Sequence, residues 1–334
     1  MSQLEFNLLY TPGTVRYFSR FVGSLLEYSS ASFRLVSNGC RPAEQRYLRE
    51  LCRHDPRLEF HALPALGPRP HGQALNYLHA LSRAEHFCFL DSDIFAAGDF
   101  LGPVKATLAA SAAFFSAAPV WVKRAEEIMP TGFEHMNGTF NRAANGQCLG
   151  GTYFAVYDNR QLTDTMQSTG IGFDEARWAD LPEPAQRAIS ALGLQKTSYD
   201  TGKVLNLLLA ARGAGLTWLE LPGLVHIGGA SFQVAYDQQP LRRGWSALLD
   251  WTGLRRRLGR RRFPTMQPAE ANWHLSQRDQ QRDPTRQYAL RLLDALHHGA
   301  TPPPAVVTGD AEIDQRLQAA RARIIELFAR QPAA

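Results

Sequence analysis

Two aspartates separated by one residue, Asp91 and Asp93, come directly after the apolar run HFCFL at 86–90. In an extended chain the side chains of residues i and i+2 point to the same side, so the two carboxylates face a common point. They repel each other there unless a cation or a proton lies between them. Oxygen ligands suit Mg²⁺ or Mn²⁺. The pattern therefore indicates either a divalent metal site or a surface turn with two solvated acids.

A histidine far along the chain is a candidate third ligand. His226 lies in the segment LVHIGGAS, after an apolar run and before Gly228 and Gly229. Imidazole is a common metal ligand, and the two glycines would let the following chain approach a diphosphate closely. A lone histidine beside a strand is more often a hydrogen-bonded structural residue. The upstream aspartate pair is what favours the interpretation as a metal ligand.

Short apolar runs alternate with amphipathic runs through the first third of the chain, which predicts alternating strands and helices. Strands are predicted over 4–10, 33–37, 58–63 and 86–90, and helices over 15–28, 43–52 and 73–82. This alternation predicts the α/β class, with a mostly parallel sheet that helices cover on both faces. Ligands of such sheets bind at the carboxyl ends of strands, where Asn38 and Asp91 both lie.

The middle of the chain, 123–200, is less regular and rich in glycine, asparagine and proline. The remaining predicted elements are strands over 151–157, 216–221 and 224–227 and a helix over 201–212. The uncharged stretch 106–122 approaches a membrane span in length. Its Ala, Ser and Thr content and Pro119 favour instead a helix that runs into a buried strand.

The ordered series of motifs over about 4–230 resembles the GT-A glycosyltransferases, in particular family 2-like members. The family's Gly-x-Ala-x-Asn element, which opens a helix ahead of an Asp-x-Asp strand, is matched by Gly72, Ala74 and Asn76. The segment VSNGC at 36–40 resembles the end of the family's second strand, although Ser37 replaces the usual aspartate. LLYTPGTV, at the start of the chain, is similar to the family's first strand and loop.

The resemblance implies a Rossmann-like GT-A catalytic domain over 1–235, with a nucleotide-sugar half over about 1–122 and an acceptor half over about 123–235. It implies that the nucleotide sugar contacts Thr11, Asn38, Asn76, Asp91, Gly150 and Gly151. It implies that Mn²⁺ or Mg²⁺ is bound by Asp91, Asp93 and His226. The expected reaction is transfer of a hexosyl group to a glycan or lipid-linked acceptor. In this reaction a metal that bridges the diphosphate would stabilise the charge on the leaving group.

An inverting transferase also needs a general base for the acceptor hydroxyl. In the resembled family an acidic residue that opens the helix corresponding to 201–212 has this role, which points to Asp200 as the catalytic residue. Tyr199 precedes it where the family commonly has a glutamate. An aspartate before a helix is also a good N-cap, so both roles stay open. Asp174 and Glu175 are the next candidates for the base.

The basic charge of the chain is concentrated in one segment, 241–263, which carries eight arginines and one aspartate within a chain of net charge +5. Leucines and tryptophans recur there at helical spacing, which is typical of an interfacial helix that binds anionic lipid. A helix docked on the catalytic domain with solvated arginines is the alternative. The near-neutral remainder argues against nucleic acid as a partner.

The C-terminal third is predicted to be a helical extension. We expect a basic helical part over 236–300, a proline-rich linker over 301–310 and a terminal helix over 311–334. Apolar residues of that helix, from Ile313 to Leu327, follow a 4-3-4-3 spacing like a coiled-coil seam. A homodimer is one explanation of this seam, and docking on the chain's own domain is the other.

The four cysteines form no C-x-x-C pair, and the N-terminus lacks the layout of a signal peptide. Both observations predict a cytoplasmic protein without a disulfide framework, with peripheral attachment to the inner face of the membrane as an option.

The competing functions are a HAD-like phosphatase and a non-catalytic module that binds anionic surfaces. A HAD-like enzyme would have Thr or Val where Phe95 stands, and a sugar nucleotidyltransferase would have a glycine-rich N-terminal loop.

Overall fold

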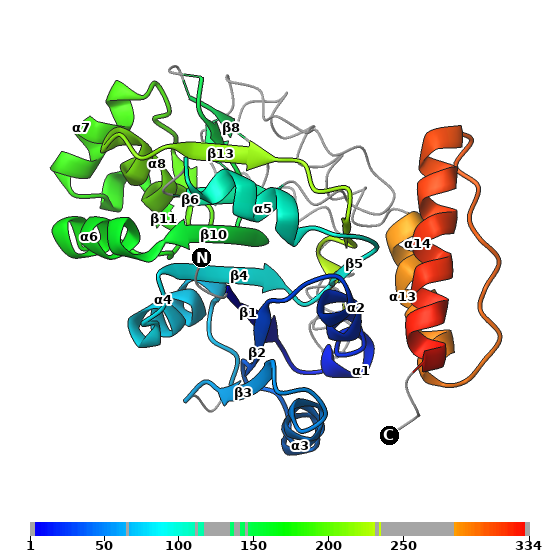
Figure 1. Cartoon of the computed structure of the whole chain (residues 1–334). Coiled ribbons are helices and arrows are strands. Elements are labelled where there is room, and N and C mark those ends of the chain that lie inside the picture. Colours follow the sequence, from blue (N-terminus) through cyan, green and yellow to red (C-terminus); the bar gives the residue numbers. More distant parts are fainter. Residues whose placement is uncertain are drawn as a thin grey trace, which may run out of the picture.

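A seven-stranded sheet with the order β13-β6-β10-β4-β1-β2-β3 forms the centre of the molecule (Figure 1). The structure is a computed structural model that describes residues 4–64, 67–110, 113–116, 134–136, 141–143, 146–230, 234 and 284–330. Strand β10 runs antiparallel to both of its neighbours, and the other pairings of this sheet are parallel. The α/β class with a mostly parallel sheet, expected from the sequence, is confirmed.

The strands of the main sheet are β1 (Glu5–Tyr10), β2 (Ser32–Ser37), β3 (Leu58–Ala62), β4 (His86–Asp91), β6 (Ala113–Ser116), β10 (Phe154–Asp158) and β13 (Leu216–Leu219). Two short strands form a separate pair, β5 (Ile94–Ala96) and β14 (Leu224–His226). The other short strands are β7 (His135–Met136), β8 (Asn141–Arg142), β9 (Cys148–Leu149), β11 (Ala176–Arg177) and β12 (Ser198–Tyr199).

The helices lie on both faces of the sheet. The first set is α1 (Val15–Phe18), α2 (Phe21–Glu27), α3 (Pro42–Cys52), α4 (His71–Leu81) and α5 (Leu101–Leu108). Later helices are α6 (Asn159–Thr169), η1 (Trp178–Asp180), α7 (Glu183–Ala191), α8 (Lys203–Ala211), α13 (Pro284–His297) and α14 (Ala311–Arg330).

The apolar run of β4 is buried on both faces, as expected for a central strand. Its side chains alternate between the two hydrophobic clusters that lie on opposite sides of the sheet: Cys88 and Leu90 face one, and Phe87 and Phe89 face the other. Helices α4, α6, α7 and α8 contribute to the Phe87 side. Helices α1, α2, α3, α5, α13 and α14 contribute to the opposite side. The sheet thus fixes the end of β4, where Asp91 lies.

Most predicted elements agree with the observed bounds to within two residues, and two differ more. The helix expected over 15–28 is two helices, because Ser19 and Arg20 have ψ angles of −26° and −22°, closer to 3₁₀ than to α geometry. The strand expected over 151–157 begins only at Phe154. Before it, Thr152 bonds to the loop that precedes α8, with Thr152 Oγ1 donating to Thr201 O at 3.3 Å.

Helix α5 and strand β6 occupy the described part of the uncharged stretch 106–122, as predicted. Within the part of the chain that the structure describes, no helix has the length and apolar character needed to cross a membrane. The basic segment 241–263 lies outside the described residues. Its binding to an anionic membrane therefore remains a prediction.

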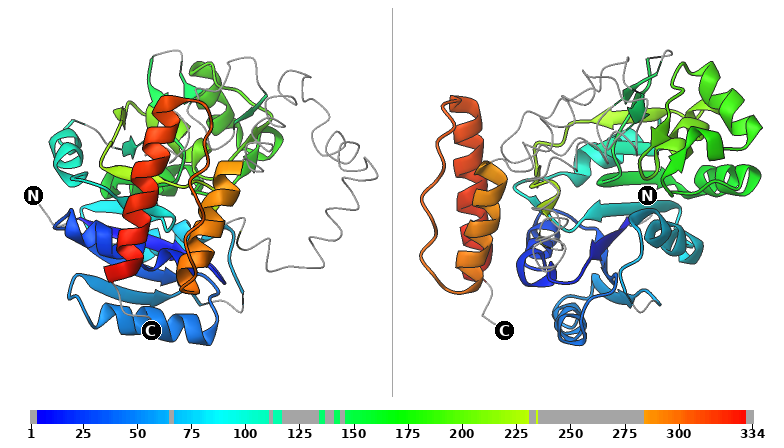
Figure 2. Two further views of the ribbon diagram at one scale, coloured as in Figure 1. Left: turned by 90° about the vertical axis from the view of Figure 1, so that its right-hand side faces the viewer. Right: turned by 180° about the vertical axis from the view of Figure 1, so that it is seen from behind.

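Helices α13 and α14 lie side by side along one flank of the molecule, next to α1 and α2 (Figure 2). Four side chains of the predicted seam are buried in the chain's own core: Leu317, Ala320, Ile324 and Leu327. Docking on the chain's own domain accounts for this seam, and a homodimer stays a prediction. The division of the chain into domains likewise stays a prediction.

The central aromatic cluster provides a test of this core. Phe6 is fully buried, with its ring centroid 5.9 Å from that of Phe33 and 5.5 Å from that of Phe154. We expect Phe6→Ala to lower the free energy of unfolding by about 3–5 kcal/mol, measured by denaturant titration. The control Val307→Ala, at a position 79% exposed, should change it by less than ~0.5 kcal/mol. Equal effects of the two variants would contradict the described packing.

Candidate active site

Asp91, Asp93 and His226 are brought together by the pairing of two short strands. Strand β4 ends at Asp91, and after a two-residue turn the chain enters β5, which pairs antiparallel with β14. In this register His226 lies opposite Ile94, the residue after Asp93. The backbone N–H of Ile227 also donates to Asp93 O at 3.2 Å. The pairing places the histidine beside the aspartate although they are far apart in sequence.

The three side chains offer one ligand atom each within a space of 4.8 Å. His226 Nε2 lies 3.3 Å from Asp93 Oδ1 and 3.8 Å from Asp91 Oδ2. The side chains of Asp93 and His226 are 2% and 8% exposed, whereas that of Asp91 is 33% exposed. The two carboxylates suit Mn²⁺ or Mg²⁺, and the imidazole is a ligand of transition metals, so the residues present fit Mn²⁺ better than Mg²⁺. One side of the cluster is open to a ligand from solvent.

The second oxygen of Asp93 is held by the glycine loop after β14. The backbone N–H of Ala230 donates to Asp93 Oδ2 at 3.0 Å. Gly228 and Gly229 have φ angles of 76° and 66°, a left-handed conformation that glycine adopts at little cost. The glycine pair thus turns the chain back toward Asp93. Of the two oxygens of this carboxylate, Oδ1 is the one directed at His226.

The two aspartates differ in their affinity for protons. Burial and the Asp93 carboxylate raise the pKa of Asp91 to about 7, although His226 acts in the opposite direction. Burial also acts to raise the pKa of Asp93, but His226 and the backbone N–H of Ala230 outweigh it and lower the pKa below its usual value. Near neutral pH Asp93 is therefore a carboxylate, whereas Asp91 is protonated in part of the molecules.

Thr11 and Asn38 lie at the same edge of the sheet, because they follow the carboxyl ends of the parallel strands β1 and β2. In the register of β1 and β4, Leu9 lies opposite Asp91. Asn38 is 3% exposed, and its side chain holds the backbone of Arg69, with Nδ2 donating to O at 3.0 Å and Oδ1 accepting from N at 2.8 Å. A contact of either residue with the nucleotide stays a prediction.

Asn76 joins α4 to the loop that carries Asp174. Its Nδ2 donates to Asp174 Oδ2 at 2.7 Å, and its Oδ1 accepts from the backbone N–H of Phe173 at 2.8 Å. The contact is close: a Cβ at Gly172 would lie 2.3 Å from Asn76 Oδ1, and one at Gly72 would lie 2.6 Å from Phe173 O. The Gly-x-Ala-x-Asn element therefore positions the loop that carries Asp174. A contact between Asn76 and the donor stays a prediction.

Asp200 lies before α8, as expected, but it does not cap this helix. The N-cap residue is Gly202, with φ of 71° and no side-chain cap. Asp200 Oδ1 instead accepts from the backbone N–H of Thr201 at 2.8 Å, and the Asp200 N–H donates to Met136 O at 2.8 Å. The glycine replaces the expected aspartate cap because the chain enters α8 through a left-handed residue. The role as general base remains a prediction.

Two residues near Asp200 were not predicted from the sequence. Lys203, at the start of α8, is fully buried, and its ammonium group donates to the Gly150 carbonyl at 2.8 Å. The only sequence signal is a lysine at the head of an otherwise apolar helix, KVLNLLLAA. His71 opens α4, and burial lowers its pKa while the negative charge of Asp200 opposes this shift. Lys203 therefore places a buried hydrogen-bond donor against the predicted donor loop, Gly150 and Gly151.

No protein-family model and no curated protein matches the chain. Among solved structures it is similar to GT-A glycosyltransferases. For Staphylococcus aureus TarS 1–349 the identity is 14% and the TM-score 0.44, over 98% of this chain and 91% of the other. For the galactosyltransferase LgtC, solved with donor and acceptor sugar analogues, the identity is 8% and the TM-score 0.41, over 68% of this chain and 87% of the other.

For the glycosyltransferase GlyE of Streptococcus pneumoniae the identity is 10% and the TM-score 0.37, over 68% of this chain and 55% of the other. This chain spans 38% of a longer TarS chain, with 15% identity and a TM-score of 0.42. With TM-scores below 0.5, these similarities do not by themselves assign a function, which has to come from the geometry of the site.

The raised pKa of Asp91 gives a test of the site in metal-free buffer. Between its ordinary value of 3.8 and about 7, the folded state holds a proton that the unfolded chain releases. The free energy of unfolding should therefore fall as the pH rises through this window. We expect wild type to lose stability relative to Asp91→Asn between pH 5 and pH 8, measured by urea denaturation in EDTA. A difference that does not change with pH would contradict the described environment of Asp91.

Proposed function

We propose that this chain is a metal-dependent glycosyltransferase that uses a nucleotide-diphosphate sugar as donor. The observation that carries the proposal is the convergence of Asp91, Asp93 and His226 at the carboxyl edge of a mostly parallel sheet, where such folds bind ligands. Asp93 and His226 are buried and Asp91 is partly open. This arrangement suits a cation held by the protein on one side and by phosphate oxygens on the other.

Each group at the site has a distinct part in this proposal. Asp91, Asp93 and His226 hold Mn²⁺ or Mg²⁺, which supplies positive charge to the departing diphosphate. Lys203 holds the Gly150 carbonyl in place through its side-chain nitrogen. Such preorganised groups favour stabilisation of a developing anion because they need no rearrangement during the reaction.

Asp200 is the proposed general base that takes the proton of the acceptor hydroxyl. It is partly exposed, and among the described residues its Oδ1 accepts a hydrogen bond from the N–H of Thr201. Asp174 is the alternative base, since its carboxylate is exposed and oriented by Asn76. The acceptor is proposed to be a glycan or a lipid-linked glycan, with 241–263 as the segment that contacts an anionic membrane.

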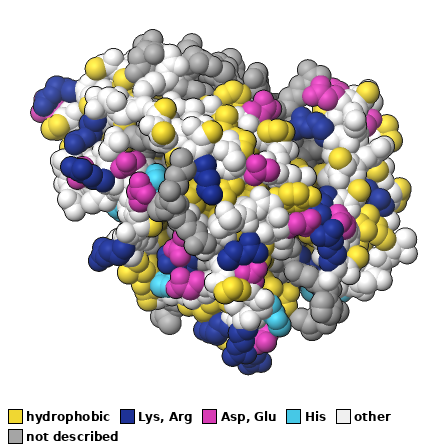
Figure 3. Space-filling view, viewed as in Figure 1, with side chains coloured by type: hydrophobic (Ala, Val, Ile, Leu, Met, Phe, Trp, Pro, Cys, Tyr) yellow, Lys and Arg dark blue, Asp and Glu magenta, His cyan; other side chains and the backbone are white. Residues whose placement is uncertain are grey.

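Surface charge agrees with a small-molecule donor rather than a nucleic acid as the main ligand. On the face drawn in Figure 3, basic and acidic side chains are interspersed over the described residues. A nucleic-acid site would concentrate basic residues on one face or along one groove. The arginines that could form such a surface belong to the segment 241–263.

Stabilisation by ligands is the direct test of the proposal. UDP is the first probe, because structures of TarS 1–349 in complex with UDP and with UDP-GlcNAc are among the similar ones. We expect UDP with Mn²⁺ to raise the melting temperature by several degrees, since ligand at 100 times its Kd adds about 2.7 kcal/mol. UDP with EDTA should have little effect. Asp93→Asn should lose the shift, and the control Asp180→Asn should keep it.

A shift without metal dependence, or none with any nucleoside diphosphate tried, contradicts the metal-dependent mechanism. Hydrolysis of sugar phosphates without a preference for nucleotides would support the phosphatase alternative.

Replacement of the base should affect transfer without affecting donor binding. For Asp200→Asn we expect the rate of transfer from the identified donor to fall by roughly 10²- to 10⁴-fold, while the melting shift with UDP and Mn²⁺ is retained. Asp174→Asn is the matched comparison. A loss confined to Asp174→Asn, with near-normal transfer by Asp200→Asn, would assign the base to Asp174.

A further inference from the structure

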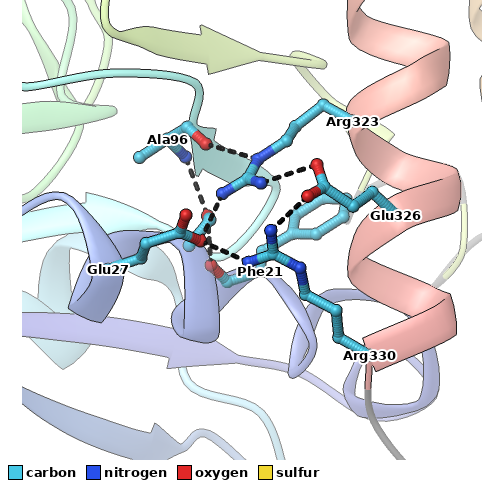
Figure 4. A network of polar contacts seen from close by, with 7 residues as sticks. Phe21, Glu27, Ala96, Arg323, Glu326 and Arg330 are labelled. Carbon is cyan, nitrogen blue, oxygen red and sulfur yellow. Dashed lines mark hydrogen bonds and ion pairs between the residues drawn. The ribbon is translucent and has the colours of Figure 1, made fainter.

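The strand that follows the aspartate pair is held by two helices at its outer edge. Strand β5 pairs with β14 on one side. On the other side its last residue, Ala96, donates its N–H to Ser24 Oγ of α2 at 2.9 Å. The Ala96 carbonyl accepts from Arg323 Nε of α14 at 3.3 Å (Figure 4). Both polar backbone groups of Ala96 are thus satisfied by side chains from other elements.

Arg323 is itself fixed by ion pairs and burial. Its side chain is 10% exposed, with Nη1 donating to Glu326 at 2.7 Å and Nη2 donating to Glu27 at 2.7 Å. The planar guanidinium offers several donors in a rigid fork, so these two carboxylates set the direction of Nε toward Ala96. The guanidinium also lies 5.2 Å from the ring centroid of Tyr28. One side chain therefore connects α14, α2 and β5.

This connection reaches the metal-ligand cluster through a short path. Ala96 is three residues from Asp93, which directly precedes β5, and its partner on β14, Leu224, is two residues from His226. A displacement of β5 toward or away from α2 would therefore move both ligands. Metal affinity depends on such outer contacts, because they fix the orientation of the groups that bind the ion.

We infer that Arg323 is a positioning residue of the Asp91–Asp93–His226 site, and that α14 belongs to this site although it supplies no ligand. The inference rests on the proposed metal-dependent function. It assigns to the C-terminal helix a role in metal binding, in addition to burial of its apolar side chains.

Arg330 provides a matched control within the same network. It pairs with the same two glutamates as Arg323, through Nη1 to Glu27 at 2.9 Å and through Nη2 to Glu326. Its side chain is 52% exposed, and no hydrogen bond to β5 is found for it among the described residues. Arg330→Met thus removes equivalent ion pairs and leaves the bond to Ala96 in place.

The experiment measures Mn²⁺ affinity by electron paramagnetic resonance, without nucleotide or acceptor. We expect Arg323→Met to weaken Mn²⁺ binding by ~3- to 10-fold, which is less than the ~10- to 100-fold effect of direct outer-shell contacts because Arg323 acts through the backbone of β5. Arg330→Met should stay within about two-fold of wild type. Ser24→Ala, which removes the other partner of Ala96, should weaken binding in the same direction. Hydrogen exchange at the Ala96 amide should be faster in Arg323→Met than in Arg330→Met.

Unchanged Mn²⁺ affinity in a folded Arg323→Met protein overturns the inference, and so does an equal loss in Arg330→Met. If Arg323→Met does not fold, unchanged affinity in Ser24→Ala overturns it. Wild type that binds no Mn²⁺ contradicts the proposed metal-dependent function itself. The wild-type measurement therefore tests the function, and the variants test the role of α14.

Discussion

The antiparallel pairing of β5 with β14 is the interaction on which the candidate site depends. Each strand has only three residues, yet the pairing puts His226 within 3.3 Å of an oxygen of Asp93. A buried carboxylate is unfavourable unless a positive or hydrogen-bonding group compensates it. Here the compensation comes from the imidazole, from the backbone N–H of Ala230 and, in the proposed function, from a divalent cation.

Much of the surrounding structure holds this pair of strands in place. Gly223 lies close to the segment that follows β5. An added Cβ at Gly223 would be 2.5 Å from Asp99 O, and the backbone N–H of Ala97 donates to Gly223 O at 2.8 Å. The outer edge of β5 is completed by Ser24 and Arg323. The main sheet positions Asp91, whereas contacts outside the sheet position Asp93 and His226.

The sequence predicted the features that depend on local patterns. The apolar run before Asp91, the alternation of strands and helices, and the polar residues at the carboxyl ends of β1 and β2 all follow from residue type and spacing. His226 was predicted as a ligand only because the aspartate pair upstream favours that interpretation over a structural histidine. Three-residue strands have too little periodicity to be paired by inspection, so the contact between β5 and β14 could not be derived from the sequence.

Other parts of the site depend on contacts between distant residues. The carboxamide of Asn76 is engaged by the loop at 173–174, about 97 residues further on. Lys203 resembles a surface lysine at the start of a helix until its burial beside Gly150 is known. Arg323 is separated from Ala96 by 227 residues. Such long-range polar contacts have no local signature, and they are where the structure adds most to the functional account.

Crystals grown with Mn²⁺ and UDP offer the most direct measurement of the central claim, through anomalous diffraction at the manganese edge. The account predicts an anomalous peak between Asp93 and His226, with diphosphate oxygens on its open side. The peak should lie ~2.0–2.6 Å from a carboxylate oxygen, which is the range for hard cations. A peak elsewhere, or UDP bound with His226 still paired to Asp93 and no ion between them, would contradict it.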